Sequence, residues 1–491
     1  MEGNTKPAQA HGLAGGVLSL FDSVVMAIAG TAPAYSIAAT SAVLFGAVGL
    51  AGPGALLWSG IPMFGVVMAF LYLNRWQPNA GASYAWVGKA LQGDLGFLAG
   101  WALIVSATIF MVAGSFPAGS MTLDLFAPQL AQNLVAVTIV GGLWFIVISC
   151  LVMMGIRITA NAQWIMSSIE LLILVVSGII AIVKFGLHGV TAVHLSWFLP
   201  SGFPSISVFI SGALIATFYY WGWDVSANLN EESKDSHRIP GIAVAIGIVI
   251  LFLIFELFTT AIQTGMTGTE INAASANVLQ ALGVKLYGPI WGNIMVVAVA
   301  LSTIATLETS LLQVTRTLFS MGRDGVLPSA FARIHLKWRT PHFASIIVLI
   351  VGLVLFVASN FLPSISAVMS DAINAISLQV VFYYALAAIT VVVFYRKVLF
   401  KSAGNFIFLF LWPAIAAIFL VIVGVSDVPS LGPVVDGVGL GLLAVGVIPM
   451  LWGHFARRNP FYLGRREVYE PSLAVAAGDQ AIGGLNASSE D

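Results

Sequence analysis

Long apolar stretches recur along almost the whole chain and are separated by short polar segments. A helix that crosses the hydrocarbon core of a bilayer needs about 20 mainly apolar residues. The pattern therefore predicts an all-α integral membrane protein with twelve transmembrane helices. We expect the first apolar stretch, which is too long for a signal peptide, to remain as a span. The predicted spans lie at roughly 16–47, 54–74, 96–126, 133–154, 162–186, 205–229, 240–263, 290–321, 343–361, 366–395, 405–425 and 436–456.

The composition agrees with a chain surrounded by the lipid bilayer. Hydrophobic residues make up 59% of the 491 residues and charged residues only 8%, whereas soluble proteins carry about 25% charged residues. The single cysteine, Cys150, excludes an intramolecular disulfide and a thiolate metal cluster. The histidines lie in or beside predicted loops, and no phosphate-binding glycine loop occurs. We expect no catalytic residues, no cofactor and no nucleic-acid partner.

The positions of lysine and arginine predict the orientation. With the N-terminus in the cytoplasm, eighteen of the twenty basic residues fall in cytoplasmic segments, and only Lys184 and Lys285 fall outside. Basic residues concentrate on the cytoplasmic side of membrane proteins. The distribution favours an even number of spans in a cytoplasmic (inner) membrane, with both termini in the cytoplasm.

Two predicted spans contain residues that interrupt a helix halfway. The first span contains Gly30-Thr31-Ala32-Pro33, and the sixth contains an aromatic segment, 219–224, with Gly222 inside it. Glycine and proline at matching places in two halves of a transporter indicate discontinuous helices at a binding site near the middle of the membrane. Glycine and proline are also common in ordinary membrane helices, but a matched pair favours the first interpretation.

Three motifs resemble those of a known family. The segment 78–84 reads PNAGASY, where Ala82 replaces the second glycine of the family signature. The segment 321–328 reads MGRDGVLP, and GWD at 222–224 precedes two glutamates and an Ile-Pro pair. These segments resemble the amino acid–polyamine–organocation permeases, which share the leucine-transporter fold. The resemblance covers roughly residues 16–400.

The resemblance implies a domain organisation and a mechanism. It implies five-plus-five inverted repeats, alternating access, and discontinuous helices 1 and 6. We expect a cytoplasmic N-terminus at 1–15, a transport core at 16–400 with repeats at about 16–186 and 205–395, helices 11 and 12 at 401–458, and a cytoplasmic, disordered tail at 459–491.

A broken helix leaves backbone groups that suit an amino acid. The half-helix after Gly30 would present N–H donors to a carboxylate, and the carbonyl groups before Gly222 would suit an ammonium group. Pro33 removes one donor, which leaves a simple amine as an alternative substrate. The resemblance places Phe218 over the substrate, where an aromatic ring can also hold a cation. The predicted substrate-binding residues are Gly30, Thr31, Ala32, Phe218, Tyr219, Trp221, Gly222 and Glu308.

Ionisable residues within spans usually have a function. Glu170 falls where some proton-coupled relatives carry a lysine, so the resemblance implies a role in coupling. The alternative is a structural hydrogen bond to the unwound backbone of the first span. Glu308, with Ser302 and Thr303 nearby, suits a Na⁺ ion or a substrate amine, although a metal site is not our first expectation. For Asp22 and Asp224 we expect helix-end roles, and we propose no partner for Glu256.

The sequence predicts a secondary active transporter that imports an amino acid or a related small amine, driven by protons. The alternatives are a polyamine or other cationic amine importer and Na⁺-coupled uptake. A channel and an intramembrane enzyme are alternatives from another class. A channel would not require matched broken helices, and an enzyme would need a catalytic constellation that the chain lacks.

Overall fold

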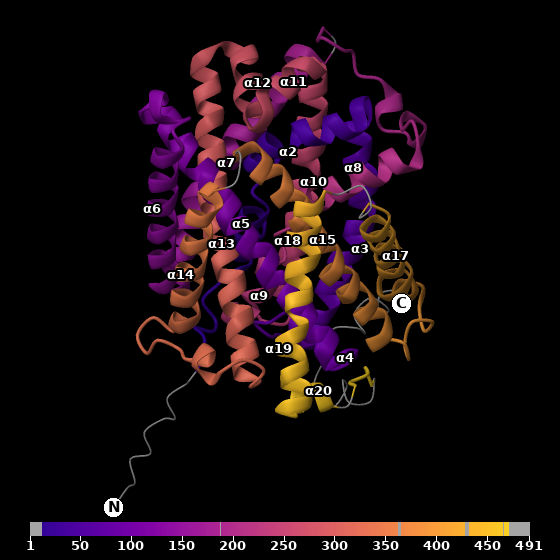
Figure 1. Cartoon of the computed structure of the whole chain (residues 1–491). Coiled ribbons are helices and arrows are strands. Elements are labelled where there is room, and N and C mark those ends of the chain that lie inside the picture. The colour runs from indigo at the N-terminus through magenta and orange to yellow at the C-terminus, as the bar shows by residue number, and fades with distance from the viewer. Residues whose placement is uncertain (1–11, 187, 362–364, 428–431, 465, 471–491) are drawn as a thin grey trace, which may run out of the picture.

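The described residues fold into one bundle of helices. A computed structural model describes residues 12–470 apart from 187, 362–364, 428–431 and 465. Figure 1 shows the longer helices running roughly side by side, with α11 and α12 at one end and α4 and α20 at the other. This arrangement agrees with a membrane protein whose polar loops lie at the two ends.

The first half of the chain contains α1 (Leu20–Thr31), α2 (Pro33–Val48), α3 (Gly52–Trp76), α4 (Ser83–Ala90), α5 (Gly93–Phe126), α6 (Leu134–Met153) and α7 (Ile156–Phe185). The second half contains α8 (Ile206–Tyr219), α9 (Val225–Asn228), α10 (Ile239–Gly265), α11 (Gly268–Ala274), α12 (Val278–Tyr287), α13 (Pro289–Arg323), α14 (His342–Ala358) and α15 (Ile365–Phe394). After these come α16 (Ala403–Asn405), α17 (Trp412–Asp427), α18 (Pro433–Val445), α19 (Val447–Leu451) and α20 (Pro460–Leu463).

Several of these helices can cross a membrane. Within the described residues, ten helical stretches are long and apolar enough to do so. The first, Leu20–Trp76, is 57 residues long and includes α1, α2 and α3, whereas α8 is shorter than the others. Each predicted span coincides with helix in the structure. The protein is therefore a multi-pass membrane protein, while the count of twelve crossings remains a prediction.

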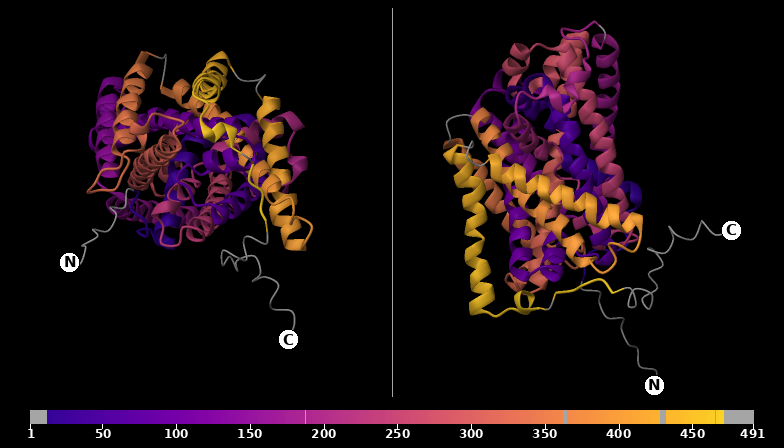
Figure 2. Two further views of the ribbon diagram at one scale, coloured as in Figure 1. Left: turned by 90° about the horizontal axis from the view of Figure 1, so that it is seen from below. Right: turned by 90° about the vertical axis from the view of Figure 1, so that its right-hand side faces the viewer.

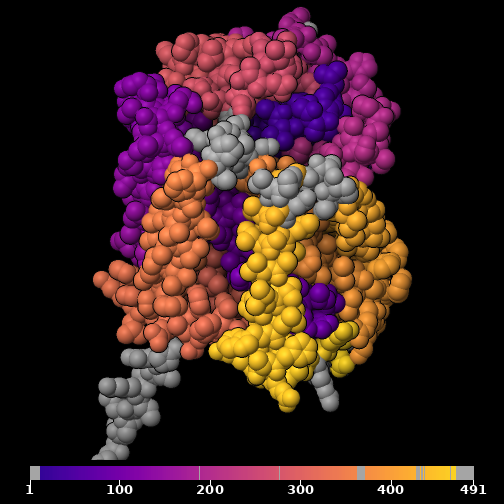
Figure 3. All heavy atoms as spheres, in the orientation of Figure 1, coloured from indigo at the N-terminus to yellow at the C-terminus, as the bar shows by residue number. Residues whose placement is uncertain are grey.

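The outer helices expose the apolar side chains that a lipid environment requires. Leu143 on α6, Val354 on α14 and Ile418 on α17 are 55%, 62% and 61% exposed. Figure 2 shows α17 and α18–α19 at the periphery of the bundle, and Figure 3 shows α14 and α18–α19 as separate columns on one face. By contrast, α13 is central and packs against α1, α2, α5 and α7.

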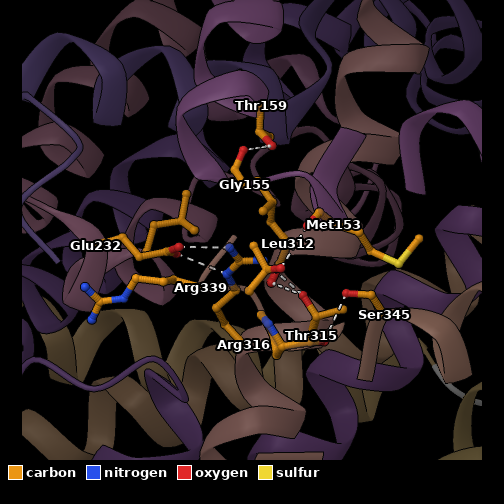
Figure 4. A network of polar contacts seen from close by, with 12 residues as sticks. Met153, Gly155, Thr159, Glu232, Leu312, Thr315, Arg316, Arg339 and Ser345 are labelled. Carbon is orange, nitrogen blue, oxygen red and sulfur yellow. Dashed lines mark hydrogen bonds and ion pairs between the residues drawn. The ribbon is translucent and has the colours of Figure 1, made fainter. Parts of the chain in front are cut away.

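A buried ion pair fastens the end of the bundle that we predict to be cytoplasmic. Arg316 of α13 donates two hydrogen bonds to Glu232, at 3.1 and 2.9 Å, and both side chains are fully buried (Figure 4). The backbone carbonyl of Glu232 accepts hydrogen bonds from the N–H groups of Val17 and Leu18. The pair thus connects α13 to the segment that leads into α1.

The neighbouring glutamate joins two of the family-like motifs. Glu231 pairs with Arg323 at 2.8 Å, and it accepts a hydrogen bond from the N–H of Ala80. Tyr84 donates to Asp324 at 3.0 Å. The segments 78–84 and 321–328, far apart in the sequence, therefore meet at this end. At Ala82 the backbone φ is 42°, in the left-handed region that favours glycine.

The beginning of the expected tail is folded. Residues 460–463 form α20, and the N–H of Tyr469 donates to the carbonyl of Phe394. Phe461 stacks on Tyr84, with ring centroids 4.7 Å apart. These contacts hold the chain against α4 and α15 as far as residue 469. Residues 471–491 of the expected disordered tail and 1–11 of the expected N-terminal segment lie outside the described residues.

The buried pair predicts a measurable loss of stability when one partner is neutralised. In Glu232→Gln, the Arg316 charge remains buried without its counter-ion, which costs about 3–5 kcal/mol. The apparent melting temperature in detergent should fall clearly. The matched control is Glu231→Gln. In its pair with Arg323, the arginine side chain is 37% exposed and the glutamate side chain 22%, and exposed pairs contribute about 0–1 kcal/mol to stability. Equal losses in the two variants would show that burial of the first pair does not matter.

Candidate functional site

The first helix break is one residue long. Helix α1 ends at Thr31, Ala32 has φ 51° and ψ 61°, and α2 begins at Pro33. A non-glycine residue in this left-handed conformation is strained, so the surrounding structure must hold it. Proline at the first position of α2 fits because that N–H would lack a helical partner in any case.

Side chains from α13 and from α2 itself stabilise this break. The Thr306 hydroxyl of α13 donates to the Ala29 carbonyl at 2.6 Å. The Ser36 hydroxyl donates to the Thr31 carbonyl at 2.8 Å. Exposed backbone groups at a break cannot be satisfied by lipid, and these hydroxyl groups replace the missing helical partners.

The first free N–H groups of α2 are bonded to protein. Ala34 N–H donates to Glu170 Oε1 at 2.9 Å, and Tyr35 N–H donates to Ser302 Oγ at 3.2 Å. We expected these donors to face a substrate carboxylate. This is wrong in this structure, because side chains of α7 and α13 already accept their hydrogen bonds. Glu170 instead makes the hydrogen bond to the unwound first span that we considered as its structural alternative.

The second break lies between α8 and the very short α9. Helix α8 ends at Tyr219, and Gly222 adopts φ 101°, a conformation that side chains rarely permit. The Val225 N–H donates to the Gly222 carbonyl at 3.2 Å, which starts the next turn. The sequence prediction placed this break correctly at Gly222.

The two breaks are in direct backbone contact. A Cβ atom added to Gly222 would lie 2.0 Å from the carbonyl oxygen of Gly30, and one added to Gly30 would lie 2.2 Å from that of Gly222. Neither position has room for any side chain. The two glycines therefore allow the end of α1 to approach the unwound segment at Gly222 closely, in addition to the conformational freedom that Gly222 needs.

Aromatic rings gather beside the two breaks. The Trp221 ring lies 5.9 Å from Phe110 and 6.3 Å from Phe218, and Phe110 lies 5.6 Å from Tyr35. We call Tyr35, Phe110, Phe218 and Trp221 the aromatic cluster. Aromatic faces of this kind attract organic cations. The structure brings Phe218 and Trp221 together as predicted, while Phe110 and Tyr35 were missed.

The other aromatic residues of the second break face elsewhere. The hydroxyl of Tyr219 lies 3.1 Å from that of Ser41 on α2, and the Tyr219 ring packs on Phe255 of α10. The Tyr220 hydroxyl donates to the Leu56 carbonyl of α3. These contacts fix the end of α8 between its neighbours.

A buried carboxylate positions Trp221. Asp224 accepts hydrogen bonds from Tyr383 at 2.9 Å, Tyr384 at 3.1 Å and Gln313 at 2.9 Å. Trp221 in turn donates to the Tyr383 hydroxyl at 2.8 Å. Asp224 lies at a helix end as expected, at the N-cap position of α9, but its side chain makes no cap hydrogen bond there and binds α13 and α15 instead. The signal that was overlooked is the pair of adjacent tyrosines within the apolar tenth span.

The remaining ionisable residues have distinct surroundings. Asp22 forms a capping box with Ser19 at the start of α1, so its helix-end role is confirmed. Both carboxyl oxygens of Glu256 are buried without a hydrogen-bond partner among the described residues. Thr303, predicted for Na⁺, donates to the Val299 carbonyl of its own helix.

Glu308 lies at the contact of α13 with α7. Its Oε2 atom accepts a hydrogen bond of 2.6 Å from Gln163 of α7, and the same amide group donates to the Ala305 carbonyl at 2.8 Å. Both side chains are buried. Glu308 is thus held toward α7, the helix that also carries Glu170.

Comparison with known proteins agrees with this architecture. A family model described as amino acid permease matches residues 18–443. The chain is 26% identical over 433 residues to the human large neutral amino acids transporter small subunit 2, covering 84% of this chain and 76% of that protein. It is 25% identical over 320 residues to the low-affinity putrescine importer PlaP of Escherichia coli K12, covering 63% of this chain and 67% of the importer.

A third relative is the human Asc-type amino acid transporter 1, 27% identical over 307 residues, or 60% of this chain and 56% of the relative. All three similar proteins are transporters by name, and the matched family region contains both helix breaks, the aromatic cluster and Glu170. The chain therefore belongs to the amino acid permease family, whose members are transporters and not enzymes.

Proposed function

We propose that the protein imports an amino acid or a related small amine by alternating access, with Glu170 coupling this movement to a proton. The observation that carries the proposal is the contact of the two breaks at Gly30 and Gly222, beside a buried carboxyl group that bonds the first turn of α2. Unwound segments in contact allow α1 and α9 to move against the rest of the bundle without breaking regular helices.

The lengths of the helices support twelve crossings. A helix of 57 residues would be about 85 Å long at 1.5 Å per residue, far more than the roughly 30 Å of a hydrocarbon core. The Leu20–Trp76 stretch thus supplies two crossings, α1–α2 and α3, and α8 with α9 supplies one more. We propose two inverted five-helix repeats, α1–α7 and α8–α15, in a cytoplasmic membrane with both termini inside.

The surroundings of Glu170 suit a group that binds and releases a proton. Its side chain is fully buried, and Oε2 has no hydrogen-bond partner among the described residues. A carboxylate without a counter-ion is costly to bury, so a proton on Oε2 stabilises this arrangement. Tilting of α1 away from α7 would admit water to this atom and allow the proton to leave.

The substrate site that we propose consists of the breaks and the aromatic cluster. It contains Gly30 and Thr31 at the end of α1 and Ala32 and Gly222 at the two breaks, together with Phe218 and Trp221. Glu308 is left out because Gln163 holds its carboxyl group toward α7. The substrate ammonium group would lie against aromatic faces and backbone carbonyls.

A diamine importer is the second candidate. It is favoured because Glu170 and Ser302 already bind the N–H groups of Ala34 and Tyr35 that a substrate carboxylate would need. The similarity to a putrescine importer agrees with a substrate that has amines only. A thermal-shift screen of the purified protein against amino acids and diamines distinguishes the candidates, since only one class should raise the melting temperature.

The contact between the breaks predicts that a single methyl group added at Gly222 strongly weakens substrate binding. In Gly222→Ala, the new Cβ must push α1 away from α9, because it would lie 2.0 Å from the Gly30 carbonyl. Affinity for L-leucine or putrescine, whichever binds the unaltered protein, should fall at least tenfold. Gly268→Ala is the control, since nothing lies within 4 Å of its added Cβ. Unchanged affinity in folded Gly222→Ala protein would exclude these breaks as the binding site.

The coupling role predicts a separation of two transport modes. Glu170→Gln imitates the protonated group, so exchange of substrate across a proteoliposome membrane should continue. Net accumulation driven by a pH gradient should collapse at least tenfold, because no proton can be released. Na⁺ coupling through Glu308, Ser302 and Thr303 predicts instead that Na⁺ stimulates uptake at fixed pH. Accumulation by Glu170→Gln from a pH gradient alone would show that Glu170 is structural.

The proposed topology can be tested with a single cysteine. In a Cys150→Ala background, a cysteine at Lys337, in the segment between α13 and α14, should be protected from a membrane-impermeant thiol reagent in intact cells. A cysteine at the exposed Asn272 of α11, on the opposite side, should react. The reverse pattern of labelling would show that the protein has the orientation opposite to the one we propose.

A further inference from the structure

A fully buried polar stripe continues from Glu170 along α7. Gln163, Ser167 and Glu170 have the spacing i, i+4 and i+7, which places them on one face of the helix. All three side chains have no exposed surface. Polar side chains are expensive in a membrane interior and usually functional there, so a continuous stripe calls for an explanation.

The stripe contains oxygen atoms that no protein group satisfies. Among the described residues, Glu170 Oε2, Ser167 Oγ and Gln163 Oε1 have no hydrogen-bond partner. Glu308 Oε1, on the facing helix α13, has none either. Buried polar groups are nearly always hydrogen-bonded. Four oxygen atoms without a hydrogen-bond partner in one region therefore point to a ligand that binds there. The smallest ligand that such acceptor atoms can bind is a proton.

Helix α13 lies alongside the stripe and carries a second carboxyl group. Ser302 and Glu170 accept hydrogen bonds from the adjacent N–H groups of Tyr35 and Ala34, and Gln163 donates to Glu308 Oε2 at 2.6 Å. Glu308 lies six positions after Ser302 in the sequence, which corresponds to a rise of about 9 Å along a helix. This rise leads toward the end of α13 that carries the Arg316–Glu232 pair. The stripe thus extends from the break toward the predicted cytoplasm.

Charged groups near the stripe have other partners, with the exception of Glu256. The helices packed against α7 are α1, α6, α10, α12 and α13, and α6 has no charged residue. The charged residues that the others contribute, besides Glu308, are Asp22, Glu256, Lys285, Arg316 and Arg323, and α12 also carries Tyr287. Asp22 binds Arg157 and Ser19, Lys285 binds Glu270, and the two arginines bind Glu232 and Glu231. Glu256 is on α10 and has no polar partner among the described residues.

We propose that Glu308 is the second proton-binding group of the transport cycle, which receives the proton of Glu170 through a water molecule beside Ser167 and passes it toward the cytoplasm. The inference rests on the proposed coupling role of Glu170. Ser167 Oγ has no hydrogen-bond partner among the described residues, so the transfer requires water, which tilting of α1 would admit. In this transfer the Glu170 Oε2–H bond breaks, and the water molecule held by the Ser167 hydroxyl accepts that proton while it gives up one of its own. The second proton forms an O–H bond at Glu308 Oε1. Gln163 positions Glu308 by holding Oε2.

The two carboxyl groups have different roles in this scheme. Exchange of substrate across the membrane requires no proton release, so it is independent of Glu308. Net uptake requires release in every cycle, so it depends on Glu308 and Ser167. The ratio of net uptake to exchange therefore isolates the relay from any effect on folding or substrate binding.

The test uses full-length protein in proteoliposomes, with labelled L-leucine or putrescine, whichever the unaltered protein accumulates. In Glu308→Gln the ratio of net pH-driven uptake to exchange should fall at least tenfold, and Glu308→Asp should restore part of it. Ser167→Ala should lower the ratio about threefold or more. Glu256→Gln, which neutralises a buried carboxyl group outside the stripe, should leave the ratio unchanged.

A second measurement separates this proposal from the proposed function. Purified Glu308→Gln protein should still take up a proton when substrate binds, because Glu170 is intact, whereas Glu170→Gln should not. A ratio unchanged in Glu308→Gln and in Ser167→Ala would overturn the relay and leave coupling by Glu170 standing. If Glu308→Gln cannot be reconstituted, an unchanged ratio in Ser167→Ala alone is sufficient to overturn the relay. If the unaltered protein shows no pH-driven uptake, the proposed coupling and the relay both fail.

Discussion

The backbone contact between Gly30, in the last turn of α1, and the unwound segment at Gly222 is the constraint on which the rest of the structure depends. Each segment leaves N–H and C=O groups without helical partners, and lipid cannot bind them. The segments can approach closely only because neither glycine carries a side chain. Helices α7, α13 and α15 then supply polar groups in the middle of an otherwise apolar bundle.

The polar groups around the breaks follow from that requirement. Thr306 and Ser302 of α13 and Glu170 of α7 bind the backbone of the first break. Asp224 collects three hydrogen bonds at the second break and, through Tyr383, fixes Trp221. One of these groups, Glu170, retains an oxygen atom without a partner among the described residues. The group that stabilises the break is thereby also the group best placed to respond when α1 moves.

The sequence predicts much of the fold because hydrophobic length and glycine positions are local signals. Each predicted span coincides with helix, and the break at Gly222 is placed correctly. The partners of side chains could not be predicted, because they depend on how distant helices pack. Free N–H donors were expected after Gly30, but Glu170 and Ser302, 136 and 267 residues from their partners, occupy them. The side-chain partners of Asp224 were missed for the same reason, since Tyr383 lies 159 residues away.

The central claim is that substrate binding and protonation of Glu170 are linked. If the substrate binds better to the protonated protein, binding must draw a proton from solution near neutral pH. Isothermal titration calorimetry of the substrate in two buffers with different ionisation enthalpies measures this uptake directly. We expect a net uptake of protons, at most one per bound substrate, in the unaltered protein and none in Glu170→Gln. An enthalpy that does not depend on the buffer in the unaltered protein would contradict the account.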